Sequence, residues 1–257
     1  MIKTPTKTKI FGYSSLQECL KSLDFLTYQR KTNEKEYIMR NKKMNILEPK
    51  HVKRVMRYLE DTSRQLNRDK TMFNLSLRQG LRSIEISNLQ WKNVLDSDGV
   101  DVTFKEWMVV TNDQSKGKSS GREIPIHKDT RESLTQLLNE KFDSKDWVLN
   151  KKKDIPKLMN SYVIVSQQLI GNENEGNKLS NVTVTNWFHR LYKELGMVGF
   201  GSHSGRRTFI TEGSKKISLH GGSLRDVMEL CGHSSIQTTQ GYIESSPKSK
   251  MDLLKDM

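Results

Sequence analysis

Apolar residues recur three and four positions apart along much of the chain, a spacing that predicts amphipathic helices. The first helix is expected to begin near Pro49, because proline is tolerated in a first turn, and the second to end at Gly80. Ser83 is expected to cap a third helix that runs to Leu89. The apolar positions of the first two helices are Val52, Val55, Met56 and Leu59, then Met72, Phe73, Leu75 and Leu77.

The pattern changes between residues 100 and 126, where β-branched and aromatic residues predict strands. Two strands are expected at Val100–Phe104 and Trp107–Val110. A return strand is expected at Arg122–Ile126, in which Pro125 indicates an edge position. The intervening residues Asn112–Gly121 are rich in serine, glycine and lysine, so they are predicted to form a hairpin loop.

Helical spacing returns in the second half, where Gly196 is expected to end one long helix. Gly171–Lys178 is predicted to be a polar loop. Asp226–Cys231 is predicted to be a helix that Gly232 stops, and Ser235 to start the next. Together the patterns predict a mainly helical domain with one small antiparallel sheet. The two long stripes are Leu134, Leu137, Leu138 and Phe142, then Trp187, Phe188, Leu191 and Leu195.

The chain is basic, with 43 Lys and Arg against 30 Asp and Glu, a formal net charge of +13. This surplus favours a polyanionic partner such as DNA, the alternative being a solvated basic surface. No apolar run approaches the ~20 residues of a membrane span, and no signal peptide opens the chain. Cys19 and Cys231 are too few for a disulfide framework, which suits a reducing cytoplasm. No metal or other cofactor is predicted.

Residues 1–47 differ from the rest because they are more basic and poorer in apolar surface. A short helix is plausible over Ser14–Arg30, but the segment offers too little apolar area to fold alone. It is expected to dock on the main domain or to order on DNA, through residues such as Lys42 and Lys43. A basic tail with no fixed structure is the alternative.

Six polar residues suit the attack of a phenol on a phosphodiester without a metal. Guanidinium groups bind phosphate oxygens through two parallel hydrogen bonds, so two arginines can stabilise the developing charge. A phenol has a pKa of ~10 and needs a base or a positive field to act as nucleophile. The six residues are Arg82, Lys116, His203, Arg206, His233 and Tyr242.

The spacing of these residues supports contact with one phosphate. Arg82 precedes a predicted helix start, where backbone N–H groups favour an anion. Glu85, one turn later, either holds this guanidinium or is a surface glutamate. His203 and Arg206 lie at positions i and i+3, on one helix face. Arg207 points about 100° away and is expected to touch the DNA backbone.

The order and context of these residues resemble the tyrosine recombinase (phage integrase) family over roughly residues 48–245. The resemblance rests on Gly-Leu-Arg-Ser-Ile-Glu around Arg82, His-Ser-Gly-Arg-Arg-Thr from His203, and Cys-Gly-His-Ser-Ser-Ile-Gln-Thr-Thr-Gln before Tyr242. It implies the family's catalytic-domain fold, which is mainly α with a small antiparallel sheet (α+β).

The resemblance also implies a reaction. Tyr242 would attack DNA to give a 3′-phosphotyrosine and a 5′-hydroxyl, and strands would exchange through a Holliday junction without ATP or metal. Arg82 and Arg206 would clamp the phosphate, while His203 and His233 would exchange protons or donate hydrogen bonds. Lys116 on the hairpin would be the general acid, with Lys118 as the alternative. The DNA-contacting residues would include Lys118, Arg122 and Arg207.

The implied partners are double-stranded DNA with att-like sites, a homo-oligomer (a tetramer on paired sites) and an accessory DNA-bending protein, without a membrane. The expected location is the cytoplasm of a bacterial or archaeal host, at the nucleoid. The role would be integration or excision of a phage or mobile element. A type IB topoisomerase activity and a catalytically inactive DNA-binding relative remain the alternatives.

The chain departs from the family in length. Residues 1–47 are too few for the family's core-binding domain, so the chain is either a minimal integrase or lacks upstream sequence. Residues 48–245 would be the catalytic domain. The tail 246–257 would dock on a neighbouring protomer, in cis, or not at all. Gly213–Gly222 makes the stretch from Arg206 to His233 longer than in compact members, which predicts a longer loop.

Overall fold

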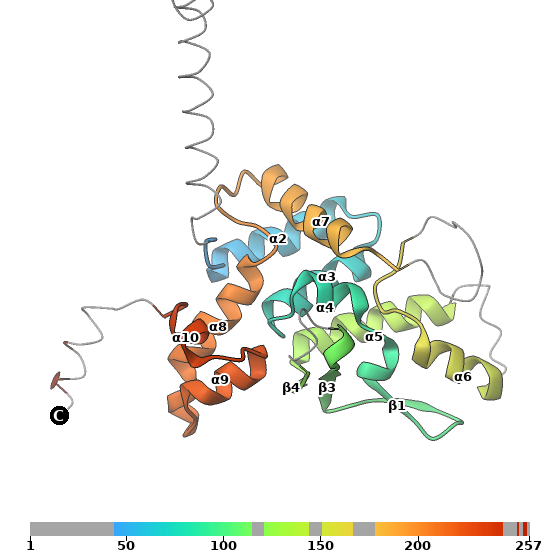
Figure 1. Cartoon of the computed structure of the whole chain (residues 1–257). Helices are drawn as coiled ribbons and strands as arrows, with labels where there is room; N and C mark the ends of the chain where they lie inside the picture. Colours follow the sequence, from blue (N-terminus) through green and yellow to red (C-terminus); the bar gives the residue numbers. More distant parts are fainter. Residues whose placement is uncertain are drawn as a thin grey trace, which may run out of the picture. The chain divides into compact units, whose positions relative to one another are not determined.

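The computed structural model describes residues 44–114, 121–143, 151–166, 178–243, 251 and 254–255 (Figure 1). Met44–Met257 groups as one compact unit apart from Met1–Lys43. The predicted helix at Ser14–Arg30, the lysines Lys42 and Lys43, and most of the tail after residue 245 lie outside the described residues. The predicted domain limits at 47/48 and 245/246 therefore stay predictions.

The described part of the chain is mainly helical, with short strands between its early and middle helices. In chain order its elements are α2 (Pro49–Thr62), α3 (Leu66–Leu77), α4 (Ser83–Asn88), η1 (Trp91–Asn93), β1 (Leu95–Ser97), β2 (Val102–Phe104), β3 (Trp107–Val110), η2 (Asn112–Gln114), β4 (Arg122–Pro125), α5 (Lys128–Asp143), α6 (Lys151–Asn160), α7 (Asn181–Glu194), α8 (Ser204–Lys216), η3 (Ile217–His220), α9 (Leu224–Cys231) and α10 (Ile236–Gln240).

Helix α3 is the centre of the core. It packs against α2, α5 and α8, and every residue from Thr71 to Leu77 is buried. The main apolar cluster extends from α2 through α3 and α5 to α7. A second, smaller cluster joins Ile210 of α8 to Val227 and Cys231 of α9, and the ring of Tyr242 packs against it. Helices α8, α9 and α10 lie together in Figure 1, which shows them in orange to red.

The strands form two separate two-stranded sheets instead of the single sheet predicted. Strands β1 and β2 pair with each other, while β3 pairs with β4 in an antiparallel register that sets Trp107 opposite Pro125 and Val110 opposite Arg122. The predicted edge position of Pro125 is confirmed, since both strands of such a pair are edges. Strand β1 escaped prediction because Leu95–Ser97 contains a single apolar residue.

Other departures involve helix limits. Helix α6 was not predicted, because Lys151–Lys153 and the internal Pro156 hide its apolar spacing. The predicted loop at Gly213–Gly222 is largely helical, since α8 continues to Lys216 and η3 follows directly. The helix that follows Ser235, which was expected to present Tyr242, is α10; it ends at Gln240, so Tyr242 lies in the turn after it.

Two glycines allow α8 to approach the turn after α3. Gly80 has a φ of 63°, and a side chain there would meet the ring of Phe209 on α8. A Cβ on Gly205 would collide with the Ser76 hydroxyl and the backbone of Leu77 on α3. These close contacts bring the first residues of α8 against the α3–α4 turn. None of the described helices is long and apolar enough to span a bilayer.

Candidate active site

The α3–α4 turn, the start of α8 and the end of α9 meet around Arg206. Its guanidinium donates to the carbonyl oxygen of Gly80 over 2.5 Å and to that of Cys231 over 2.6 Å. The side chain is 2% exposed. Burial lowers the pKa of Arg206 to about 10, and the neighbouring charge of Arg82 adds to that effect, so the group is still a cation at neutral pH.

Glu85 is the acceptor that joins the arginines of this region. The Glu85 carboxylate accepts hydrogen bonds from the backbone N–H and from the guanidinium of Arg82, each over 2.8 Å. This makes Arg82 the N-cap residue of α4, in place of the predicted Ser83. The Arg206 Nη1 atom lies 3.9 Å from the same carboxylate. Glu85 is 1% exposed, so the structure favours the role of holding the guanidinium over that of a surface glutamate.

The charge state of Glu85 follows from its neighbours. Burial alone would raise the pKa of this carboxyl. The hydrogen bonds and charge of Arg122, the Arg82 backbone N–H and the charge of Arg206 outweigh that effect and lower the pKa below its usual value. Glu85 is therefore ionised in the folded protein at neutral pH.

Arg122 belongs to this network. Its guanidinium binds both oxygens of Glu85, over 2.9 and 3.1 Å, and its Nε donates to the carbonyl oxygen of Leu230 over 2.8 Å. The side chain is 5% exposed. This placement does not support the predicted contact of Arg122 with DNA, because its guanidinium binds Glu85 and Leu230 within the protein; the contact stays a prediction.

His233 follows α9 and the left-handed residue Gly232. Its Nδ1 shares a hydrogen bond of 2.9 Å with the Thr239 hydroxyl, and its ring stacks on that of Tyr242 with centroids 5.8 Å apart. Burial first, and then the charges of Arg206 and Arg82, lower the pKa of His233 to about 4. The imidazole is consequently neutral at pH 7.

The structure brings five of the predicted residues into one region: Arg82, Glu85, Arg206, His233 and Tyr242. Of the two clamp arginines Arg82 is the more accessible, with 20% of its side chain exposed. Tyr242 is half-buried, and its carbonyl accepts from the Thr211 hydroxyl over 3.4 Å.

The remaining predicted residues are placed differently. His203 is the N-cap of α8 and is exposed, although it lies one turn from the buried Arg206. Arg207 is only 8% exposed, on a helix that packs against both α3 and α9. Its predicted contact with the DNA backbone is therefore not supported. Lys116 and Lys118 lie outside the described residues, so the choice between them stays open.

Sequence reasoning missed the groups that orient Arg206 and His233. The carbonyls of Gly80 and Cys231 orient Arg206, yet backbone acceptors leave no trace in side-chain patterns. Thr239 is fully buried and fixes one ring nitrogen of His233. Its position six residues after the histidine, on the next predicted helix, was the only available signal.

The neutral state of His233 predicts a pH-dependent stability. The unfolded chain titrates this group near 6.5 and the folded chain near 4, so the unfolded state binds more protons between these values. Stability should therefore fall by about 2–3 kcal/mol as pH drops through this window. His233→Gln should lack that part of the decline when urea unfolding is compared at about pH 7 and about pH 4.5. An equal loss of stability in the wild type and in His233→Gln would contradict the low pKa of His233.

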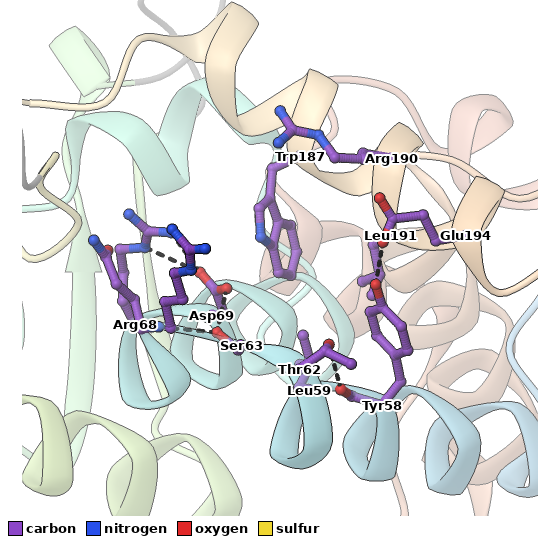
Figure 2. A pocket seen from close by; sticks show the side chains of 12 residues that line it. Tyr58, Leu59, Thr62, Ser63, Arg68, Asp69, Trp187, Arg190, Leu191 and Glu194 are labelled. Atoms are coloured by element: carbon purple, nitrogen blue, oxygen red, sulfur yellow. Dashed lines mark hydrogen bonds and ion pairs between the residues drawn. The ribbon is translucent and has the colours of Figure 1, made fainter.

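A separate groove lies between α2, the α2–α3 turn and α7, with a volume of about 370 Å³. Figure 2 shows the side chain of Trp187 pointing from α7 toward α2 and α3. Two pairs of polar side chains in the groove bind each other: Arg68 donates to Asp69 over 2.8 Å, and the Tyr58 hydroxyl donates to Glu194. None of the predicted catalytic residues lines it.

Comparison with known proteins identifies relatives. The model of the phage integrase family matches residues 45–249. The tyrosine recombinase XerC of Thermodesulfovibrio yellowstonii is 25% identical over 178 residues, which are 69% of this chain and 50% of XerC. The chain thus spans about half the length of the curated relative it matches.

Solved structures share the fold. The Tn1549 transposon integrase in complex with a circular intermediate DNA superposes with a TM-score of 0.56 at 17% identity, over 83% of this chain and 67% of the integrase. The XerA recombinase gives 0.53 at 18%, over 82% and 64%. A lambda integrase dimer bound to a core site gives 0.52 at 19%, over 79% and 48%. At these identities the likeness concerns the fold, which confirms the predicted mainly helical class; the described residues form two small antiparallel sheets in place of the one predicted.

Proposed function

The chain belongs to the phage integrase family, and on that premise we propose that it is a site-specific tyrosine recombinase that cleaves and rejoins double-stranded DNA. Tyr242 forms a 3′-phosphotyrosyl intermediate and releases a 5′-hydroxyl. The energy of the phosphodiester is kept in the new bond, so the reverse attack rejoins a strand without ATP. Exchange between two sites proceeds through a Holliday junction.

One observation carries this proposal: a neutral His233 is stacked on Tyr242 beside a buried cluster of arginines. A neutral imidazole can accept the phenol proton, whereas an imidazolium cannot. In this role Nδ1–H donates to Thr239, which leaves Nε2 as the acceptor. The positive field of Arg82 and Arg206 favours the phenolate that results.

The arginines act on the phosphate. As the Tyr242 oxygen bonds to phosphorus, charge grows on the non-bridging oxygens, and guanidinium donors stabilise it. The bond from phosphorus to the 5′-oxygen then breaks, and that oxygen takes a proton from a general acid, which we assign to Lys116 or Lys118. The exposure of His203 at the start of α8 supports a role for it as a hydrogen-bond donor to the phosphate.

Contact with the phosphate requires a local rearrangement at Arg206. The side chain is 2% exposed, and its two terminal nitrogens bind backbone carbonyls. A phosphate reaches it when the turn at Cys231–His233 shifts. Arg82 is open to a phosphate already, because a fifth of its side chain is exposed.

The proposed partners follow from the relatives. The Tn1549 and lambda integrases were solved on DNA, the latter as a dimer. We propose that this chain binds att-like duplex sites, forms a homo-tetramer on paired sites with an accessory DNA-bending protein, and serves integration or excision of a phage or mobile element. Its site of action would be the cytoplasm, at the nucleoid.

Covalent trapping tests the proposal. The full chain is incubated in EDTA with a pool of nicked duplexes of random sequence and then denatured in SDS. We expect a protein–DNA adduct at a 3′ phosphate, because the nick lets the 5′-hydroxyl fragment leave and no metal is needed. No adduct across the pool, or an adduct that appears only when magnesium is restored, would contradict the proposal.

Paired copies of the trapped site then separate the two strand-cleaving alternatives. A recombinase should produce a four-stranded branched intermediate, whereas a type IB topoisomerase should relax supercoils without one. Sequencing of the trapped DNA identifies the site.

A further inference from the structure

Arg122 ties together two parts of the active site that lie far apart in the sequence. From strand β4 it binds both oxygens of Glu85, on α4, and the carbonyl oxygen of Leu230, near the end of α9. The carbonyls of the two residues that follow Leu230 accept from the clamp: Cys231 from Arg206 over 2.6 Å and Gly232 from Arg82 over 3.4 Å. Arg122 thus holds both the shared carboxylate and the backbone that orients the clamp.

The geometry also shows that Glu85 does not hydrogen-bond directly to Arg206. Three guanidinium groups surround one carboxylate, and Arg122 occupies both of its oxygens. The Arg206 Nη1 atom stays 3.9 Å away, beyond hydrogen-bond distance. Without Arg122, the freed oxygens of Glu85 would draw Arg206 into a direct pair and compete with a phosphate for it.

We infer that Arg122 is a positioning residue: it saturates Glu85 and holds Leu230 in place, so that this carboxylate does not compete with the scissile phosphate for Arg82 and Arg206 when the Cys231–His233 turn shifts. This inference rests on the proposed function. It assigns Arg122 no contact with DNA, since its side chain is 5% exposed and bonded within the protein. It differs from a general role in folding because the effect passes through the two clamp arginines.

Arg122→Lys is the variant that tests it, because an ammonium keeps the charge but cannot bind both oxygens of Glu85 and the Leu230 carbonyl together. Arg131→Lys is the matched control. Arg131 donates to the Lys105 carbonyl over 2.6 Å and has no part in the cluster. On the duplex trapped with the wild type, we expect Arg122→Lys to slow adduct formation about 10²-fold, since small misplacements of catalytic groups have effects of this size.

DNA binding provides the first discrimination. The affinity of Arg122→Lys and its dependence on salt should match those of the wild type. Because lysine keeps the charge, Arg122→Gln is measured beside it: if Arg122 touched DNA, this neutral variant would lower the slope of log K against log salt by ~0.9 for the lost phosphate contact. Such a loss would overturn the inference.

A neutral substrate distinguishes positioning from a general structural defect. In a methylphosphonate at the scissile position, a methyl group replaces one charged oxygen, so less charge needs stabilising. The defect of Arg122→Lys should shrink on this substrate by about tenfold, as a defect in the clamp would. The same fold-loss on both substrates would overturn the inference.

The side-chain ¹⁵N spectrum provides a readout that needs no DNA. In the wild type, the guanidinium N–H signals of Arg82 and Arg206 should exchange slowly with water, because these groups are held. Arg122→Lys should move or broaden both sets and leave that of Arg131 in place. If the wild type trapped no DNA, the proposed function would fail while this spectrum would still decide the role of Arg122. Should Arg122→Lys not fold, Arg122→Gln, which keeps a single donor to Glu85, replaces it in each measurement.

Discussion

Tyr242→Phe is expected to bind DNA as the wild type does and to form no covalent adduct. The substitution removes only the nucleophilic oxygen, and loss of a nucleophile lowers a rate by at least about 10³-fold. The ring should stay in place, because it packs against Ile210, Val227 and Cys231 and stacks on His233. The measurement is trapping on nicked duplexes followed by denaturing electrophoresis.

Tyr58→Phe is the control for this substitution. The Tyr58 hydroxyl donates to Glu194 in the groove shown in Figure 2, outside the predicted catalytic residues. Its loss should leave adduct formation unchanged. An adduct with Tyr242→Phe at the wild-type level would show that another residue attacks the phosphate, and the proposed mechanism would have to be abandoned.

The neutral His233 connects this prediction to the fold. Its low pKa follows from burial together with the charges of the arginines, and both depend on its place directly after α9, where the left-handed Gly232 turns the chain. A protonated His233 would repel the clamp and could not accept the phenol proton. The arrangement that helps Tyr242 is therefore the one that makes stability decline below about pH 6.5.

The sequence predicted those parts of the fold that depend on local spacing. Helices α2, α3, α5 and α7 lie where their apolar stripes indicated, because each stripe faces the common core. The α8 extension and α6 were not predicted. Consecutive lysines, Lys151–Lys153 in α6 and Lys215–Lys216 in α8, obscure the periodicity of the few buried positions.

The candidate site likewise has one part that the sequence predicts and another that it does not. The pair Arg82–Glu85 spans one helical turn, so its contact follows from local geometry. The place of Arg122 could not be derived, because an arginine that opens a short strand has the sequence signature of a surface charge. Its burial depends on Glu85 and Leu230, which come from segments 37 and 108 residues away.

Arg207 shows the limit of helical-wheel reasoning. A rotation of about 100° takes it off the face of Arg206, which suggested exposure. Helix α8, however, packs against both α3 and α9, so two of its faces are covered. Whether a helix face is exposed to solvent depends on how many elements pack around the helix. The periodicity of a single sequence does not predict that number.

Arg206→Lys is expected to lower the rate of covalent adduct formation by about 10²–10³-fold although the charge is kept. The guanidinium spans the Gly80 and Cys231 carbonyls, which an ammonium cannot do, so a lysine would be oriented differently toward the phosphate. One buried carbonyl would also lose its donor, which should reduce the free energy of unfolding by about 1–3 kcal/mol. Adduct formation is therefore compared well below the unfolding midpoint of each protein.

The control for Arg206→Lys must conserve charge at a position outside the clamp. Arg207 does not serve, because it is buried beside the site. Arg225 does: its side chain is 76% exposed and pairs with Glu229 over 3.1 Å on the surface of α9. Arg225→Lys should change stability by no more than about 0.5 kcal/mol and leave the rate unaltered. If Arg206→Lys formed the adduct as fast as Arg225→Lys, then two-point binding by Arg206 would not contribute to catalysis, and Arg82 would have to bind the phosphate without it.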